Sequence, residues 1–199
     1  MDQVVAQAMQ KWPNVPHCYG WLGLDARGAW RMRDEQTQRQ NLPGDKIMHT
    51  ALAGFINRNY GADEHGCWYF QNGPQRVYVD LELTPYIAHT DPVQGFVLQT
   101  GEPMTAIDAV MLTEQGRLLL IAPGQVAAID DRDLAQCLTD LRMDGEIASD
   151  EALLEWMANP SKSQILTWQK SGLLLTVSHI ATENVATHFG FVQKPAKHS

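Results

Sequence analysis

Residues 76–83 read RVYVDLEL, and apolar and polar side chains alternate along them without a break. In an extended strand, successive side chains point to opposite faces, so one face here is apolar and the other is polar. A strand of this kind is typical of an antiparallel sheet that buries one face and exposes the other. The apolar positions are Val77, Val79, Leu81 and Leu83.

This strand is the second half of a predicted hairpin. Residues 67–71 form its first strand, and the turn reads Asn72-Gly73-Pro74-Gln75. Another hairpin is predicted in residues 19–33, where Asp25-Ala26-Arg27-Gly28 forms the turn. Together the two hairpins supply four strands to the first part of the chain.

A helix is predicted between the two hairpins. Apolar pairs recur every four residues from Ile47 to Ile56, which is the pattern of an amphipathic helix. Asp45 is the expected N-cap, and Gly61 is the expected stop because glycine tolerates a positive φ. A further amphipathic helix is predicted at the N-terminus, where Pro13 ends it.

The same order of elements recurs in the second half. Strands are predicted at residues 107–112 and 117–121, a helix at 131–143, and a hairpin at 165–179 whose turn is Lys170-Ser171-Gly172. Ser149 caps an extra short helix, and residues 188–193 are predicted to form a last strand. Residues 84–103 carry several prolines and glycines and are interpreted as the connection between the halves, with candidate short strands at 86–89 and 96–99.

These patterns predict an α+β protein with two tandem hairpin–helix–hairpin units and antiparallel sheets. Residues 1–95 form the N-terminal α+β unit, which adds the N-terminal helix, and residues 96–199 form the C-terminal α+β unit of similar order. Gly28 and Gly116 occupy equivalent turns, so internal structural duplication is a further hypothesis.

The charge of the chain bears on its partners. The net charge is −8, and residues 1–100 contribute −2 of it while residues 101–199 contribute −6. An acidic surface repels phosphate backbones and anionic lipids, so neither a nucleic acid nor a membrane is expected as a partner. The exposed edges of the predicted sheets make a homo-oligomer a possible assembly.

Cysteine usage points to the compartment. The three cysteines, Cys18, Cys67 and Cys137, are odd in number and widely spaced, which fits a reducing cytosol rather than a disulfide framework. The N-terminal segment lacks the pattern of a signal peptide, and no apolar run is long enough to span a membrane. We expect a cytoplasmic protein of bacterial origin.

Common catalytic motifs are absent from the sequence. There is no phosphate-binding glycine loop, dinucleotide fingerprint, nucleophile elbow or paired-histidine zinc helix. The sequence therefore predicts no cofactor and no catalytic residue, and it favours a protein that is not an enzyme.

Residue chemistry alone suggests two sites, each supported by weaker evidence than a catalytic motif would give. His65 and Cys67, with His17 and Cys18, offer imidazole and thiolate groups that zinc accepts, but their spacing matches no common zinc motif, so no metal is expected. Asp80 and Glu82 share one strand face and could divide acid and base roles. We favour the interpretation that this pair belongs to a solvated sheet face.

The aromatic hairpin is the stronger candidate for binding. Trp68 and Tyr69 stand in its first strand, and Tyr78 and Arg76 stand in the second. Aromatic residues and arginine are enriched at the centres of interfaces, so these four residues predict a groove for a ligand or a partner protein. The alternative is that at least half of the rings belong to the core.

Three stretches carry a resemblance to known sequences: YGWLGLDARG at 19–28, FINRNYG at 55–61 and WYFQNGPQRVYV at 68–79. Together they resemble an uncharacterised proteobacterial family defined only as a domain of unknown function, over roughly residues 15–145. The order of hairpin, helix and Trp-Tyr hairpin is also similar to another uncharacterised bacterial family with two repeated α+β motifs, for which a signalling or ligand-binding role has been suggested. Neither resemblance implies catalytic residues.

The sequence thus favours a cytoplasmic module that binds a ligand or a protein, or that regulates one. An enzyme with a site of unusual design, most simply a hydrolase that uses histidine or acidic residues, is one alternative. A subunit whose role is purely structural is the other. Convergence of several titratable side chains in a closed pocket would favour the enzyme.

Overall fold

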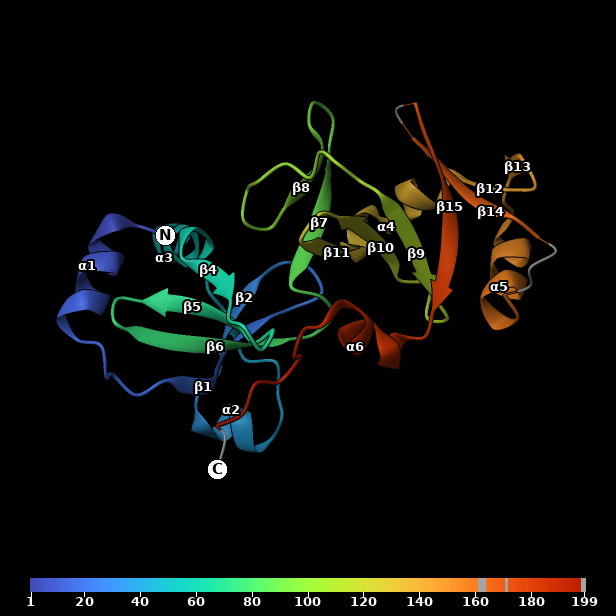
Figure 1. Cartoon of the computed structure of the whole chain (residues 1–199). Coiled ribbons are helices and arrows are strands. Elements are labelled where there is room, and N and C mark those ends of the chain that lie inside the picture. The colour runs from blue at the N-terminus through green and yellow to red at the C-terminus, as the bar shows by residue number, and fades with distance from the viewer. Residues whose placement is uncertain (161–163, 171, 198–199) are drawn as a thin grey trace. The chain divides into compact units, whose positions relative to one another are not determined.

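The computed structural model describes residues 1–160, 164–170 and 172–197. The chain folds into two compact units, which can be followed along its length in Figure 1. The first unit comprises Met1–Pro85, Gln99–Gly101 and Ala186–Ser199, and the second comprises Tyr86–Leu98 and Glu102–Val185. Among the described residues, no helix is both long and apolar enough to cross a bilayer.

This division differs from the predicted boundary between residues 95 and 96. Residues 86–91 form strand β7, which pairs with β11 (Gln125–Ile129) and so belongs to the second unit. The end of the chain returns to the first unit, where the Val192 amide donates to the Gly66 carbonyl at 3.0 Å. Both pairings join segments that are far apart in the sequence, and local patterns carry no signal for them.

The first unit contains a sheet of six strands in the order β3-β2-β1-β6-β5-β4. Three helices accompany it, and a fourth leads into the C-terminal segment. The strands are β1 (Cys18–Leu24), β2 (Trp30–Met32), β3 (Asp45–Lys46), β4 (Tyr60–Ala62), β5 (Trp68–Asn72) and β6 (Gln75–Leu81). The helices are α1 (Gln3–Lys11), α2 (Glu35–Arg39), α3 (Thr50–Arg58) and α6 (Val185–Phe189).

The α+β class is confirmed, and both predicted hairpins of this unit are present as β1–β2 and β5–β6. The expectation of a wholly antiparallel sheet is wrong, because β1 and β6 lie side by side in parallel. The hairpins each supply one strand to this central pair, and α3 lies between the hairpins in the chain. The sheet is therefore mixed.

Helix α3 covers one face of this sheet. Phe55 of the helix meets Phe70 of β5 edge to face, with ring centroids 5.4 Å apart. The helix begins later than predicted: His49 is its N-cap, and the His49 Nδ1 accepts a hydrogen bond from the Leu52 amide at 3.2 Å. Asp45 cannot be the cap because it pairs with Met32 in the sheet.

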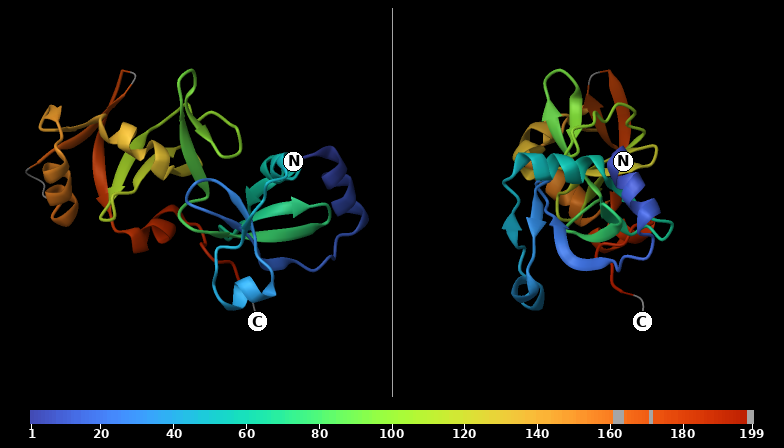
Figure 2. Two further views of the ribbon diagram at one scale, coloured as in Figure 1. Left: turned by 180° about the vertical axis from the view of Figure 1, so that it is seen from behind. Right: turned by 90° about the vertical axis from the view of Figure 1, so that its left-hand side faces the viewer.

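Helix α1 lies beside the turn of the β5–β6 hairpin (Figure 2). Val5 is its buried residue, and the Asp2 amide donates to the Asn59 side chain at 2.8 Å. Arg58 forms an ion pair with the Asp2 carboxylate at 3.2 Å. The N-terminal helix is thus attached to the end of α3 and to the hairpin turn.

The second unit contains a sheet of nine strands in the order β13-β12-β14-β15-β9-β10-β11-β7-β8. Besides β7 and β11, the strands are β8 (Gly95–Leu98), β9 (Ala109–Thr113), β10 (Leu118–Ala122), β12 (Leu141–Met143), β13 (Glu146–Ile147), β14 (Leu166–Lys170) and β15 (Leu173–Ile180). The helices are α4 (Asp131–Leu138) and α5 (Asp150–Ala158), with a 3₁₀ turn at Thr182–Asn184.

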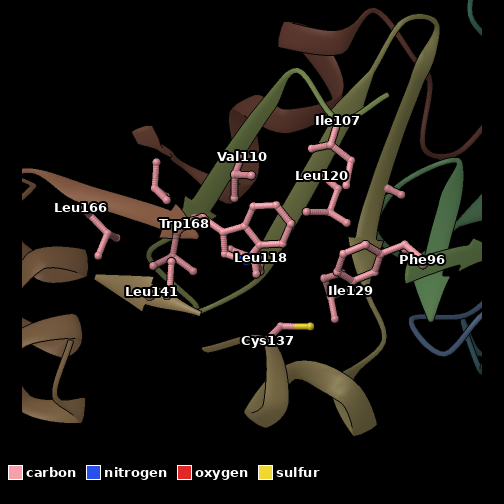
Figure 3. Packing of buried hydrophobic residues seen from close by; sticks show 14 of the residues in the cluster. Phe96, Ile107, Val110, Leu118, Leu120, Ile129, Cys137, Leu141, Leu166 and Trp168 are labelled. Atoms are coloured by element: carbon pink, nitrogen blue, oxygen red, sulfur yellow. The ribbon is translucent and has the colours of Figure 1, made fainter. Parts of the chain in front are cut away.

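Sheet strands and α4 enclose an apolar core of this unit (Figure 3). Trp168 of β14 lies at its centre with 1% of its surface exposed, and its ring centroid is 6.0 Å from that of Phe96. Leu118 and Leu120 are fully buried in strand β10 of the same sheet. These side chains come from strands that are distant in sequence, so packing rather than local propensity defines the unit.

Several boundaries in the second unit differ from the prediction. The short strands considered at 86–89 and 96–99 are present as β7, which extends to Asp91, and β8, which begins at Gly95. The helix predicted to reach Met143 ends at Leu138, because residues 141–143 pair with β14. The strand expected at 188–193 is wrong, since α6 extends to Phe189. The predicted turn at 170–172 includes Ser171, which lies outside the described residues.

Six strands of the second sheet repeat the order of the first sheet. The series β4-β5-β6-β1-β2-β3 corresponds to β12-β14-β15-β9-β10-β11, and in each series the central pair is parallel while the others are antiparallel. Helix α3 connects β3 to β4 as α4 connects β11 to β12. The shared order is a property of the topology; descent of the two halves from one duplicated unit stays a prediction.

Replacing Gly66 by alanine is expected to loosen the C-terminal segment. Gly66 has φ +76°, and a Cβ there would lie 2.1 Å from the Gly190 carbonyl oxygen. A Gly66→Ala protein should exchange the Val192 amide proton at least tenfold faster in hydrogen–deuterium exchange, because strain and collision together cost about 1–3 kcal/mol. Gly124→Ala is the control, since Gly124 has φ +72° but no atom within 4 Å of its Cβ position. Equal exchange in both variants would contradict the prediction.

Candidate functional site

The face of the first sheet opposite α3 carries the polar and aromatic side chains of β5 and β6. Tyr69 pairs with Tyr78, and Gln71 pairs with Arg76, so all four project from one face. Phe70 lies on the other face against α3. The alternation in the β6 sequence therefore gives this hairpin one apolar face, which packs against α3, and one polar and aromatic face, which is the candidate for binding.

Three tyrosines stack on this side, and we call them the tyrosine cluster: Tyr19, Tyr69 and Tyr78. Tyr19 lies parallel to Tyr78 at 4.7 Å between ring centroids, and Tyr69 meets Tyr78 edge to face at 5.9 Å. The Arg76 guanidinium lies over Tyr69, 4.5 Å from its centroid. Such a contact fixes a long side chain while leaving its charge available.

The structure thus brings together three of the four residues predicted to bind a ligand. Tyr69, Arg76 and Tyr78 are in mutual contact. Trp68 is separate, because it points to the other face and packs against Tyr60 with ring centroids 4.9 Å apart. Its position one residue before Tyr69 in a strand determines this, since neighbouring residues face opposite ways.

Tyr78 is held as a neutral phenol. It is buried, and its hydroxyl donates to the Asp63 Oδ2 at 2.9 Å. Burial raises the pKa of Tyr78 to about 12, and the neighbouring Asp63 carboxylate adds to this effect. The Asp63 pKa is low in spite of burial because the Cys67 amide and the Tyr78 hydroxyl donate to its carboxylate.

His65 and Cys67, the weak metal candidates, serve the loop before β5. Both backbone amides donate to the Asp63 Oδ1, at 3.0 Å and 2.9 Å. Burial raises the pKa of the Cys67 thiol, which disfavours the thiolate that a zinc site requires. Within residues 1–160, 164–170 and 172–197, no group of three or more histidine, cysteine or acidic side chains is arranged so that it could hold a metal ion.

Beside the tyrosine cluster lies a cavity of about 330 Å³, which we call the Arg76 pocket. It combines one cation and one imidazole with an amide and an apolar wall. Its lining residues are Met9, Pro13, His17, Gln71, Pro74 and Arg76. Burial disfavours the charge of Arg76, but the hydrogen bond to Tyr78 and the electrostatic effects of Tyr69, Tyr78 and Asp63 together outweigh it and raise the pKa of Arg76, so the guanidinium stays charged.

Gln71 is the unusual residue of this pocket. Only 1% of its surface is exposed, and its Nε2 donates to the Gly73 carbonyl at 2.9 Å. Its Oε1 is buried, and no donor among the described residues reaches it. The amide orientation is fixed, because the Gly73 carbonyl can only accept. A buried acceptor without a donor costs about 1–3 kcal/mol.

Gln71 was not among the residues that the sequence predicted to bind a ligand. The signal that could have found it is the two-residue step from Tyr69, which places Gln71 on the same strand face beside the turn. Its pairing with Arg76 completes the site but requires the hairpin register. Chemically, the pocket presents a fixed cation next to an unused acceptor, which suits binding of a group that carries both a negative charge and a hydrogen-bond donor.

Comparisons with known proteins agree with the resemblance seen in the sequence. The model of the family DUF2944, described as "Protein of unknown function (DUF2946)", matches residues 1–196. No curated protein matches the chain. The crystal structure of a DUF1285 family protein from Silicibacter pomeroyi DSS-3 is similar, with a TM-score of 0.50 and 14% sequence identity, over 89% of this chain and 96% of that chain. At this identity the likeness concerns the fold alone.

Proposed function

Because the chain belongs to the DUF2944 family, whose function is unknown, we propose from its geometry that it is a binding module that holds a small ligand in the Arg76 pocket. The buried Gln71 Oε1, which lacks a donor among the described residues, is the observation that carries this proposal. A bound ligand that donates to this oxygen would remove the cost of leaving it unpaired. The proposal includes a bacterial origin. It also includes a cytoplasmic location, which the odd number of cysteines supports.

The chemistry of the pocket defines the ligand. A carboxylate or a phosphate would pair with the Arg76 guanidinium, which binds such groups through two parallel hydrogen bonds. An N–H or O–H next to that group would donate to the Gln71 Oε1. Met9, Pro13 and Pro74 would contact an apolar portion. His17 is the single titratable side chain besides Arg76 in this lining, which supports a binder over a hydrolase.

N-acetylglycine, which carries a carboxylate next to an amide N–H, is the probe that tests the proposal. We expect the wild-type protein to bind it at least tenfold more tightly than acetate, which lacks the N–H, as measured by NMR titration. Replacing Arg76 by glutamine should weaken binding roughly 10- to 100-fold, since a hydrogen bond to a charged group contributes about 1.5–3 kcal/mol.

Gln71→Leu separates binding from stability. This variant removes the unpaired acceptor, so the melting temperature should stay within a few degrees of the wild type while the preference over acetate disappears. Arg39→Gln is the matched control, because Arg39 is exposed in a simple surface ion pair with Glu35. The proposal fails if N-acetylglycine and acetate bind the wild type equally, or if Arg76→Gln leaves the affinity unchanged.

A further inference from the structure

Gly23 lies in the middle of the first sheet, and its backbone does not require glycine. It is buried in β1 between Arg31 of β2 and Asp80 of β6. A Cβ at this position would lie 3.5 Å from the Asp80 carbonyl oxygen and 3.8 Å from the nearest atoms of Arg31 and Arg33, which are ordinary contacts. Glycine inside a strand costs about 0.5–1 kcal/mol relative to alanine and often marks a place where a ligand comes close.

The space that Gly23 leaves open is a cavity of about 270 Å³, which we call the Gly23 pocket. It lies where the parallel strands β1 and β6 end, because both Leu24 and Leu81 contribute to its wall. Charged residues dominate the lining, with three of each sign: Asp25, Asp80, Glu82, Arg31, Arg33 and Lys194.

The second sheet carries a large apolar side chain at the same position. When the two sheets are aligned on the turn glycines Gly28 and Gly116, Gly23 corresponds to Met111. Gly23 pairs with Arg31 and Asp80 on its two neighbouring strands. Met111 pairs with Leu119 and Ser178 in the same way. The shared topology therefore accepts a large apolar residue here. At this position the first sheet has no side chain and is surrounded by charged residues. The fold requires neither feature, because the second sheet has Met111 there.

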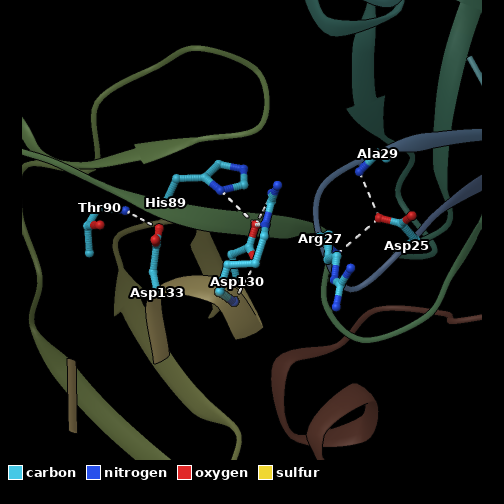
Figure 4. A network of polar contacts seen from close by, with 8 residues as sticks. Asp25, Arg27, Ala29, His89, Thr90, Asp130 and Asp133 are labelled. Carbon is cyan, nitrogen blue, oxygen red and sulfur yellow. Dashed lines mark hydrogen bonds and ion pairs between the residues drawn. The ribbon is translucent and has the colours of Figure 1, made fainter. Parts of the chain in front are cut away.

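Two ion pairs lie at the pocket, one of them partly exposed and the other largely buried. Arg31 Nε lies 2.7 Å from the Asp25 Oδ2, and Arg33 pairs with Asp80. The other oxygen of Asp25 accepts from the Arg27 and Ala29 amides (Figure 4). Asp80 was expected on a solvated face, and that interpretation is wrong, because its side chain is only 16% exposed.

Buried ion pairs seldom add stability, since the cost of desolvating two charges offsets their attraction. Burial raises the pKa of Asp80 even though Arg33 and Lys194 act in the opposite direction, so these cations do not fully offset the cost of burying its charge. At the exposed rim, the Lys194 ammonium donates to the Asn41 Oδ1 at 3.2 Å, and Glu82 accepts one hydrogen bond from the Ala26 amide. The pocket thus retains both a positive and a negative group that can engage a guest.

We propose that the Gly23 pocket binds a free amino acid, whose ammonium group contacts Asp80 and Glu82 and whose carboxylate contacts Arg31 and Lys194. A ligand of one sign would meet as many like charges as opposite ones in this lining, whereas a zwitterion matches both. The cavity is smaller than the pockets of about 300–1,000 Å³ that hold drug-sized ligands, which suits a small guest.

Isothermal titration of the full chain with each of the twenty amino acids, and with methylamine and acetate, tests this site. We expect at least one amino acid to bind ten or more times more tightly than either single-charge probe. Gly23→Val fills the cavity and keeps every charge, so binding should fall at least tenfold while the far-UV circular dichroism is retained. Gly23→Ala, whose Cβ makes ordinary contacts, serves if the valine variant does not fold.

Gly61→Ala is the control, because Gly61 also lies in a strand and no atom lies within 4 Å of its Cβ position. It should bind the amino acid as the wild type does. The proposal is overturned if no amino acid binds, if methylamine or acetate binds as tightly, or if the Gly23 variants keep full affinity. Loss of binding in Arg76→Gln would assign the amino acid to the Arg76 pocket and overturn it as well.

Discussion

Replacing Trp168 by alanine should lower the free energy of unfolding of the second unit by about 3–5 kcal/mol, the cost of removing a large aromatic side chain from a packed core. Trp168 lies in β14 with 1% of its surface exposed. Leu141 and Leu175 pair with it on the two neighbouring strands, and Phe96 contacts its ring. The cavity left behind would be surrounded by strands that cannot move independently, so little of the loss can be recovered.

Urea denaturation followed by near-ultraviolet circular dichroism measures this effect. Trp168→Phe should cost less than the alanine variant, because the indole Nε1 has no hydrogen-bond partner among the described residues and nothing polar is lost. Leu174→Ala is the matched control in the same hairpin; Leu174 is 66% exposed, so its change should stay within about 0.5 kcal/mol. A Trp168→Ala loss below about 1 kcal/mol would show that this core is not the stabilising centre of the unit.

The sequence predicts individual strands and helices better than it predicts which strands pair with one another. The hairpins around Gly28 and Gly73 are present because alternation and turn residues are local signals. The parallel pairing of β1 with β6 joins residues more than fifty positions apart, and no local period encodes it. Residues 141–143 were assigned to a helix because a three-residue strand is too short to show a period of two.

The same distinction applies to the candidate sites. Tyr69, Arg76 and Tyr78 could be predicted together because one hairpin carries them all. Asp80 could not be placed correctly, because Arg33, which covers it, comes from a segment 47 residues away. The sequence does not distinguish Gly23 from other glycines. The space for a side chain at Gly23 depends on its neighbours on β2 and β6, which come from distant segments. Register between distant segments is what the sequence lacks.

Replacing Asp130 by alanine should destabilise the second unit by about 3 kcal/mol. The side chain of Asp130 is fully buried at the start of α4, where it accepts from the Arg132 amide at 2.9 Å and the Arg132 Nε at 3.0 Å. The His89 Nδ1 lies 3.0 Å from its other oxygen (Figure 4). Loss of a helix N-cap costs about 1 kcal/mol, and loss of hydrogen bonds to a charged group adds about 1.5–3 kcal/mol. Arg132 remains largely exposed, which keeps the expected total at the lower end.

The same carboxylate makes stability depend on pH. Burial acts to raise the pKa of Asp130, but hydrogen bonds from Arg132 and the nearby His89 outweigh it and lower the pKa to about 2. Because the folded pKa lies below the unfolded value, the contribution is complete above about pH 5 and is lost as the pH falls towards 2. A shift of this size corresponds to roughly 2 kcal/mol.

Asp130→Asn isolates this contribution, because asparagine still caps the helix but does not titrate. Urea midpoints measured from pH 7 to pH 2 should fall more steeply for the wild type than for Asp130→Asn, and the two curves should converge near pH 2. Other carboxylates titrate in both proteins and cancel in the difference. Parallel curves across this range would mean that the hydrogen bonds at Asp130 do not favour its charged form, and the helix cap would then act through geometry alone.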